Sequence, residues 1–493
     1  MSVGQSLRGG IKWLMVGNMG MRLMEFAFGV ILARLLAPAD FGMIVTIQVF
    51  TGFAGMLASG GMGQSLIRAK EADANDFNAV FTMQLGLGVL IYLIFFFTAP
   101  WIAAYFDTPL YADLIRVSTV VFLMRPFAFM RRSWLNREMD FKKRSLSELV
   151  ATILTGIASV LMARAGMGVW SLTLSGLLGA LSTNIMLARL TPLKLRLNFD
   201  LDIMRKHSAY GFKITTNDFL SYLTREGKNL ILSKLAGPVF LGLFNKGESL
   251  SRIPNQLFMS ATVQPVFRAM SKVQDDLDQT KYLFYRMITL LMVYTLPLYV
   301  GLWWVAEPFI SVVYGKKWLA VAQPMSILAL SGFFLNIMHP CAVLLDAQNR
   351  LTQEMHALVI RLIVTIAACV IGLKWGLTGV AWGLLATHVF SAAYYYALVL
   401  RTIPTRPGDL FRAITPGLAL NTLLFLAFAA VHLLLGETPL SHPVLYLSLM
   451  LLTGPLVYLL AVLYLPIPAI SGESQRWRKQ LQAGLRLAPK ILK

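Results

Sequence analysis

Residues 231–242 read ILSKLAGPVFLG, and residues 31–42, two hundred positions earlier, read ILARLLAPADFG. The register continues without a gap through identical residues at Leu57 and Leu257, Gln64 and Gln264, Arg68 and Arg268, Ala69 and Ala269, and Asp76 and Asp276. Identities spread along one ungapped register are typical of an internal duplication, a common feature of transporters. The chain is therefore predicted to contain two copies of one structural unit.

The composition is that of a membrane protein. Of the 493 residues, 57% are hydrophobic and only 14% are charged, whereas soluble domains carry about 25% charged residues. Apolar runs long enough to cross a bilayer alternate with short polar segments. We predict an all-α polytopic protein with fourteen transmembrane helices, at about residues 9–36, 41–67, 77–102, 111–130, 146–163, 168–189, 208–235, 241–267, 283–303, 322–345, 355–373, 378–400, 412–434 and 444–466.

The distribution of positive charge predicts the orientation. The net charge of +20 would suit a nucleic-acid-binding protein, but the Lys and Arg residues gather in alternate loops and in the tail, so no nucleic acid partner is expected. Positively charged loops stay in the cytoplasm, which places both termini there. The most basic loop, residues 131–144, either contacts diphosphate headgroups or acts only as a topology signal beside anionic lipid.

The duplication predicts the domain organisation. Each copy holds six spans, an even number, so both copies enter the membrane in the same direction and are parallel repeats. We predict an N-terminal lobe at residues 1–190, a cytoplasmic linker at 191–205, a second lobe at 206–400, two extra transmembrane helices within 401–470 and a basic cytoplasmic tail at 471–493.

Charged residues inside the spans predict a cationic cavity between the two lobes. One face of the seventh span carries Lys213, Asp218, Arg225 and Lys228, with Glu226 beside it, and a charge near the bilayer centre costs at least about 2.5–3.5 kcal/mol. These side chains must therefore face water or a partner. The candidate substrate-binding cations of the whole chain are Lys12, Arg22, Arg116, Arg125, Lys213, Arg225 and Lys228.

The cations outnumber the acids, which favours an anionic substrate, and a diphosphate is the anion that several Arg and Lys residues match best. The acids Glu25, Asp218 and Glu226 are candidates for coupling transport to an ion. An alternative is purely structural. Arg22 with Glu25 and Arg225 with Asp218 would then be internal ion pairs, and Lys12, Lys213 and Lys228 would extend to the membrane interface.

The sequence lacks the common motifs of soluble enzymes, so no enzymatic activity is expected. The sequence contains no H-E-x-x-H, C-x-x-C or G-x-S-x-G motif and no phosphate-binding loop. His339 and His388 lie within spans and are interpreted as packing or cavity residues rather than metal ligands. No metal site, catalytic residue or cofactor is expected, apart from a coupling ion.

Several short motifs resemble one family. They include Gly9-Gly10-Ile11-Lys12-Trp13, Ala33-Arg34-Leu35-Leu36-Ala37-Pro38, Arg137-Glu138-Met139-Asp140-Phe141-Lys142 and Tyr314-Gly315-Lys316-Lys317-Trp318. Nearly the whole chain resembles the Wzx-type polysaccharide flippases, in the colanic-acid and exopolysaccharide branch of the multidrug/oligosaccharidyl-lipid/polysaccharide exporter superfamily.

The resemblance implies two six-helix lobes that move undecaprenyl-diphosphate-linked oligosaccharide across the bacterial inner membrane by alternating access. It also implies coupling to H⁺ or Na⁺ in some members. The expected partners are the lipid-linked oligosaccharide, membrane lipids and a polysaccharide polymerase or export complex. Two other functions stay open from the residues alone: a cation-coupled exporter of drugs or other small molecules, and a membrane-embedded glycan polymerase or ligase.

Overall fold

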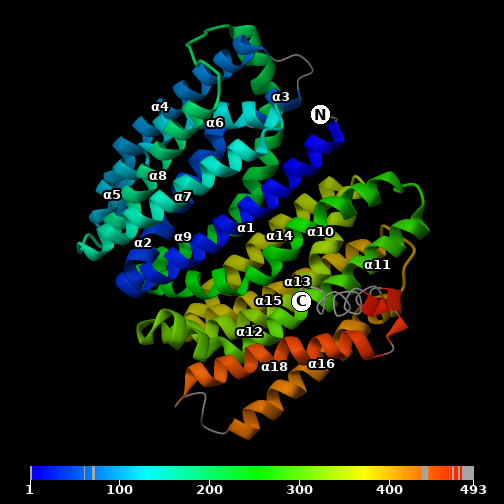
Figure 1. The fold of residues 1–493 in the computed structure, drawn as a ribbon. Coiled ribbons are helices and arrows are strands. Elements are labelled where there is room, and N and C mark those ends of the chain that lie inside the picture. The colour runs from blue at the N-terminus through cyan, green and yellow to red at the C-terminus, as the bar shows by residue number, and fades with distance from the viewer. Residues whose placement is uncertain are drawn as a thin grey trace, which may run out of the picture. The chain divides into compact units, whose positions relative to one another are not determined.

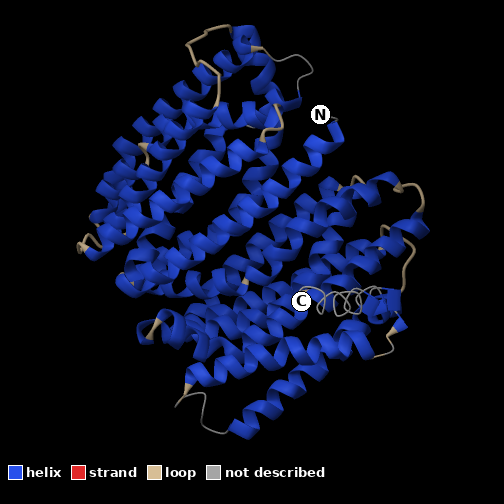
Figure 2. Cartoon of the chain, in the orientation of Figure 1, coloured by secondary structure: helices blue, strands red, loops and turns tan. Residues whose placement is uncertain are grey.

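The chain is helical in the part that the structure, a computed structural model, describes. That part comprises residues 3–59, 62–68, 73–435, 442–465, 467–468 and short pieces between 471 and 479. Every regular element within these ranges is a helix (Figure 2). The prediction of an all-α protein is confirmed, whereas the basic tail lies almost entirely outside the described residues.

The chain forms two compact units, Met1–Gly242 and Leu243–Lys493. Unit 1 contains the helices α1 (Val3–Leu35), α2 (Pro38–Ser59), α3 (Met62–Arg68), α4 (Ala74–Tyr105), α5 (Leu110–Ser118), α6 (Val121–Arg137), α7 (Phe141–Arg164), α8 (Val169–Leu190) and most of α9 (Leu201–Ser251). Unit 2 contains the end of α9, then α10 (Ile253–Lys272), α11 (Leu277–Tyr294), α12 (Leu296–Phe309), the short helices η1 (Ile310–Tyr314), η2 (Lys316–Val321) and η3 (Leu373–Trp375), α13 (Ala322–Ala347), α14 (Leu351–Gly372), α15 (Gly376–Leu400), α16 (Pro407–Leu435) and α18 (Pro443–Tyr464) (Figure 1).

Each of the fourteen predicted spans coincides with one helix or with two consecutive helices. Within the described residues, nine helical stretches are long and apolar enough to cross a membrane by themselves, and one of them, Leu351–Leu400, holds both α14 and α15. Helices α1, α6, α9 and α10 are not among the nine. Three of these, α1, α6 and α9, carry most of the predicted cavity cations, and charge lowers their hydropathy.

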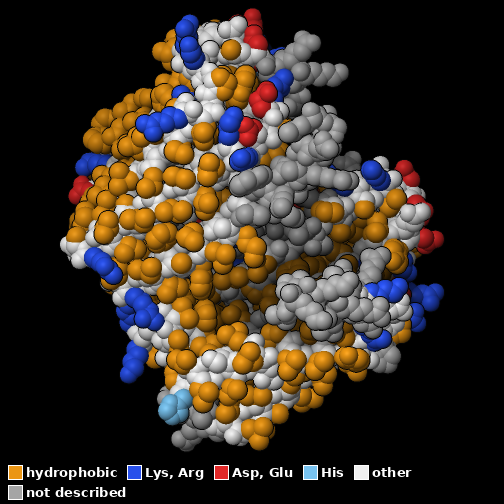
Figure 3. Space-filling model, viewed as in Figure 1, with side chains coloured by type: hydrophobic (Ala, Val, Ile, Leu, Met, Phe, Trp, Pro, Cys, Tyr) orange, Lys and Arg blue, Asp and Glu red, His pale blue; other side chains and the backbone are white. Residues whose placement is uncertain are grey.

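The outer surfaces of the helices suit a lipid environment. Phe97 on α4 is 67% exposed and Leu161 on α7 is 61% exposed, although large apolar side chains of soluble proteins are mostly buried. In the view of Figure 3, a broad hydrophobic zone covers the helices of unit 1, and most charged side chains gather toward the helix ends. The apolar surface therefore supports a multi-pass membrane protein.

The seventh span and the first part of the eighth lie in one long helical element with a break. Helix α9 runs from Leu201 to Ser251, but Gly237 within it has φ 78° and ψ 176°, outside helical values. Glycine adopts positive φ without steric penalty, and Pro238, which follows it, cannot donate a backbone hydrogen bond. The break lies two hundred residues after the turn between α1 and α2, as the repeat predicts.

Unit 1 extends beyond the predicted linker. The segment before α9 packs on α4, since the backbone N–H of Arg196 donates to Asn78 Oδ1 (2.9 Å) and that of Asn198 donates to Thr82 Oγ1 (2.8 Å). Farther along, Ser233 on α9 and Thr46 on α2 share a buried hydrogen bond of 2.6 Å. These contacts place residues 206–242 in the first compact unit, and the predicted division into lobes at 191–205 stays a prediction.

Candidate substrate site

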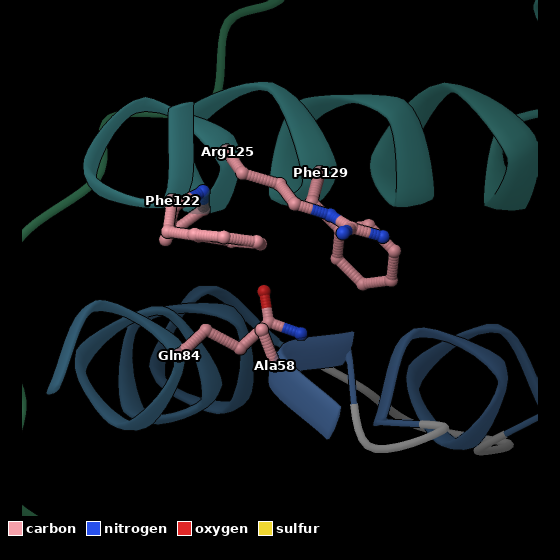
Figure 4. Close-up of a pocket in the computed structure, with 6 residues that line it drawn as sticks. Ala58, Gln84, Phe122, Arg125 and Phe129 are labelled. Carbon is pink, nitrogen blue, oxygen red and sulfur yellow. The ribbon is translucent and has the colours of Figure 1, made fainter. Parts of the chain in front are cut away.

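Arg125 lies in a small pocket inside unit 1. The pocket is lined by Gln84 of α4, Ala58 of α2 and, from α6, Phe122 and Phe129 beside Arg125. Figure 4 shows the Arg125 side chain running along α6 into the gap between the helices, into which Gln84 points from the opposite side. Arg125 is half-buried and Gln84 is buried. One predicted cavity cation is therefore held between three helices, next to an amide.

A glycine makes room for this guanidinium. A Cβ on Gly55 of α2 would lie 2.1 Å from an Nη of Arg125, closer than any real contact. Across the described residues no carboxylate forms an ion pair with Arg125. The pocket has room for about one water molecule, with a volume of about 10 Å³, so a diphosphate reaches the guanidinium only if α2 and α6 separate.

The same helix α2 anchors the second candidate region, on α9. Tyr222 donates its hydroxyl hydrogen to the backbone oxygen of Val49 (2.7 Å) and lies near that of Gln48 (3.1 Å). The guanidinium of Arg225 lies 5.6 Å from the centre of the Tyr222 ring, a distance typical of a cation–π contact. Arg125 and Arg225 are therefore both positioned along α2, the first directly at Gly55 and the second through Tyr222.

Arg225 has an acidic neighbour that was not predicted to pair with it. The Arg225 Nε donates to Glu226 Oε1 at 3.2 Å, and Asn229 Nδ2 donates to the other oxygen of Glu226 at 2.8 Å. Among the described residues the partner of Arg225 is its sequence neighbour Glu226. The Asp218 side chain lies outside the described part, so the pair of Arg225 with Asp218 stays a prediction. The Arg225 side chain remains 54% exposed, so the pair leaves much of the guanidinium accessible.

Lys228 is placed differently from Arg225. It is only 3% exposed, and its Nζ donates to the backbone oxygen of Arg225 at 2.8 Å. The ammonium is therefore buried and bonded to its own helix.

Arg116 on α5 lies apart from these residues. Its Nε donates to the backbone oxygen of Phe96 (3.3 Å), its guanidinium lies 4.9 Å from the Phe96 ring centre, and its Nη1 is 3.9 Å from Asp113 Oδ1. Asp113 and Phe96 are both exposed. Its predicted role in substrate binding stays a prediction.

Three other candidates, Lys12, Lys213 and Asp218, have side chains outside the described part of the chain. On α1, Arg22 and Glu25 are exposed. Of the candidates, Arg125 and Arg225 are each positioned against α2, the first at Gly55 and the second through Tyr222.

Part of the positive charge of the basic segment 131–144 is neutralised by a carboxylate of α7. Glu148 on α7 forms an ion pair with Arg132, whose Nε lies 3.0 Å from Glu148 Oε1, and accepts a hydrogen bond from Arg144 Nε at 3.2 Å. Burial lowers the pKa of the Arg132 guanidinium, an effect that Glu148 opposes and Arg144 reinforces. Arg144 also donates to Asn136 Oδ1. These contacts favour a structural role for this basic segment, which forms the end of α6 and the start of α7 in the structure.

A charged cluster in unit 2 was not predicted from the sequence. Arg252 forms an ion pair with Glu248, which is 5% exposed. Arg361 on α14 interacts electrostatically with both residues, and His388 on α15 interacts with the two arginines. Charges within the predicted spans 241–267 and 355–373 were the signal that could have found them.

A buried histidine near the start of α9 was also missed. His207, 1% exposed, contacts Ser65 Oγ of α3 through Nδ1 (2.7 Å) and Asp76 Oδ1 of α4 through Nε2 (3.2 Å). The arrangement joins three helices of unit 1. Among the described residues, His207 and its neighbours included, no group of three or more His, Cys, Asp or Glu side chains is placed to hold a metal ion.

The sequence comparisons find proteins of polysaccharide biosynthesis or transport. A model of a family described as polysaccharide biosynthesis protein matches residues 31–323. The lipopolysaccharide biosynthesis protein WzxC of Escherichia coli is 23% identical over 413 residues, covering 82% of each chain. The succinoglycan biosynthesis transport protein ExoT of Rhizobium meliloti is 24% identical over 332 residues, covering 67% of each chain.

Solved structures share the fold. The lipid II flippase MurJ, in an inward closed conformation, matches with a TM-score of 0.72 at 17% identity, covering 92% of this chain and 98% of that one. An inward-facing multidrug resistance transporter of the MATE family matches with a TM-score of 0.61 at 15% identity, covering 78% and 94% of the chains. The fold is that of polytopic helical membrane proteins.

Proposed function

Because the chain belongs to the polysaccharide biosynthesis protein family, we propose that it is a flippase for undecaprenyl-diphosphate-linked oligosaccharide. It moves the repeat units of an exopolysaccharide or lipopolysaccharide across the bacterial inner membrane by alternating access, with both termini in the cytoplasm. The relatives WzxC and ExoT, named for polysaccharide biosynthesis and transport, support this proposal. The family resemblance seen in the sequence motifs is confirmed by the family match.

The observation that carries the proposal is the placement of Arg125. An arginine inside a membrane protein is costly unless it faces water or a partner, and here its described neighbours are Gln84 and aromatic rings. A guanidinium presents a planar fork that matches phosphate oxygens. Separation of α2 from α6 would expose Arg125 to the diphosphate, with Arg225 held by Tyr222 farther along α2.

Coupling to H⁺ or Na⁺ is part of the proposal, through Glu25, Asp218 and Glu226. Glu226 is held by Arg225 and Asn229, and a carboxylate can exchange such a partner for an ion as the helices move. On the outer side the flipped unit would pass to a polymerase or export complex. The protein itself performs no bond-making step.

Flipping in proteoliposomes tests the proposal. Purified protein is reconstituted with lipid-linked repeat units extracted from the host, and the fraction that becomes accessible to an outside glycosidase is followed with time. We expect fast exposure with the wild type, partial loss with Arg125→Lys and nearly complete loss with Arg125→Ala, while Arg164→Ala, an exposed arginine outside the site, behaves as wild type. Wild-type protein that leaves the units on one side, or lengthens them, would refute the proposal.

A further inference from the structure

Unit 2 contains a pocket that the cationic site does not use. Its volume is about 560 Å³, and its lining includes Trp303, Trp304, Glu307, Gln323, His432 and Tyr446. The residues come from α12, α13, α16 and α18. Pockets of roughly 300–1,000 Å³ hold small ligands, and under the proposed topology this one lies at the outer face of the membrane.

One wall of the pocket is aromatic. The Trp303 and Trp304 rings meet edge to face at 5.1 Å, and the Trp304 ring lies 5.4 Å from that of His432. Tyr446, 1% exposed, packs against His432 at 5.9 Å. Trp303 itself remains 37% exposed, so part of its ring is left for a ligand.

The other side chains that line the pocket include an imidazole, an amide and a carboxylate. Tyr446 OH and His432 Nδ1 are 3.2 Å apart, which leaves His432 Nε2 as the nitrogen that can meet a ligand. Thr378 donates to Gln323 Oε1 at 3.2 Å, which leaves the amide N–H groups of Gln323 as donors. Glu307 is exposed and supplies the negative charge. The pocket thus offers donors, acceptors and a carboxylate around an aromatic surface.

We propose that this pocket binds one to three uncharged or amino-bearing sugar residues of the glycan after they reach the outer face. A pyranose ring has C–H groups on its faces and hydroxyls at its edge, which match an aromatic wall with hydrogen-bonding groups around it. Glu307 disfavours an anionic group and accepts from a hydroxyl or an ammonium. This inference rests on the proposed function, and it gives the helices α16 and α18, which lie outside the duplication, a part in substrate recognition.

Two other roles of this pocket can be distinguished from sugar binding. Tryptophans near a membrane surface commonly form an interfacial belt, but a belt needs no convergent Glu, Gln and His. A lipid headgroup with an ammonium would also meet an aromatic surface and a carboxylate. The volume of the pocket and its several hydrogen-bonding groups favour a polyhydroxylated ligand over a single ammonium.

Binding to the protein in lipid nanodiscs tests the inference. The probe is the oligosaccharide released by mild acid from the host's own lipid-linked repeat unit, which carries neither lipid nor diphosphate, titrated by calorimetry. We expect saturable binding to the wild type, and a loss of roughly ten-fold or more in affinity for Trp303→Ala and Glu307→Gln, because buried aromatic anchors dominate binding. Trp375→Ala removes a 68% exposed tryptophan outside the pocket and should bind as wild type.

The possible results separate sugar binding by this pocket from the other roles. Should the wild type not bind the oligosaccharide, or should both pocket variants bind it as well as the wild type, the inference is wrong. Binding that appears only with phosphatidylethanolamine in the disc, and not with phosphatidylcholine, would assign the pocket to a lipid headgroup. Flipping is measured with the same preparations, so that wild-type flipping without oligosaccharide binding rejects the pocket alone. Nearly isosteric Glu307→Gln keeps the test valid if Trp303→Ala fails to fold.

Discussion

Gly42 and Gly242 occupy equivalent positions in the two repeats, and each lies against the turn that precedes the other. A Cβ on Gly42 would lie 1.8 Å from the carbonyl oxygen of Pro238, and a Cβ on Gly242 would lie 1.9 Å from that of Pro38. The contact is reciprocal, and the two glycines are separated by the same two hundred residues as the two copies in the sequence. Both glycines therefore permit a backbone-to-backbone approach that no other residue allows.

Gly42→Ala and Gly242→Ala should each destabilise the protein. The added methyl would meet backbone atoms, which cannot turn away as a side chain can, and overpacking typically costs about 1–3 kcal/mol. The measurement is the midpoint of thermal unfolding in detergent. Gly86→Ala is the matched control, since a Cβ there meets nothing within 4 Å. Equal midpoints for Gly42→Ala and Gly86→Ala would contradict the close approach.

Gly55→Ala should reduce flipping with little loss of stability. Its Cβ would displace the far end of Arg125, 2.1 Å away, and a flexible end can move at low cost. A double-mutant cycle isolates the coupling: in an Arg125→Ala background, Gly55→Ala should have no further effect. Additive losses of flipping in the double variant would show that Gly55 acts independently of Arg125.

Trp318→Ala should be among the most destabilising single changes in unit 2. Trp318 is fully buried, and with Tyr314 it surrounds the ammonium of Lys246 at 5.5 and 5.4 Å from the ring centres. Removal of such a side chain costs about 3–5 kcal/mol. Trp318→Phe keeps an aromatic face and should recover part of the stability. Yield and unfolding midpoint measure both, and a midpoint of Trp318→Ala close to wild type would contradict the prediction.

His207→Ala should loosen the start of α9. The change takes away the imidazole that contacts Ser65 Oγ and Asp76 Oδ1, and an unsatisfied buried polar group costs about 1–3 kcal/mol. Limited proteolysis near residues 191–205 and the unfolding midpoint report the loss. The control is His356→Ala, because His356 is exposed. Identical proteolysis of the two variants would show that the His207 contacts are dispensable.

The sequence predicted the helices well because the signals are local. Apolar runs place the spans, and Gly237 with Pro238 marks the break in α9. The sequence also identified Arg125 and Arg225 as candidates, because a charged residue within an apolar run can be recognised without a structure. The space that Gly55 leaves for Arg125 was not predictable, because it depends on how α2 packs against α6.

Interactions between helices that are far apart in the sequence could not be predicted either. Glu248, Arg252 and Arg361 come together from α9, from the residue before α10, and from α14, and the pattern of a single helix reveals only one or two of them at a time. The contact between Arg225 and Glu226 was not predicted for a different reason. Residues one position apart do not face each other on a helix, yet the long side chains of Arg225 and Glu226 meet at 3.2 Å.

Arg225 and Lys228 should separate in their effects on transport. Arg225 is 54% exposed and carries its guanidinium at the Tyr222 ring, so it is available to the diphosphate. Arg225→Lys keeps the charge but loses the planar fork and should flip at a reduced rate, whereas Arg225→Ala should lose most flipping. Lys228, 3% exposed and bonded to its own helix, should affect stability more than flipping when changed to Ala.

Folding must be measured beside transport for this pair. Arg225→Ala removes the cation next to Glu226, and an uncompensated charge inside the membrane destabilises a protein. The double variant Arg225→Ala with Glu226→Gln removes both charges and should fold as wild type while still failing to flip. If Arg225→Ala and Lys228→Ala, alone and combined, retain wild-type stability and wild-type flipping, this face of α9 is structural and the diphosphate binds elsewhere.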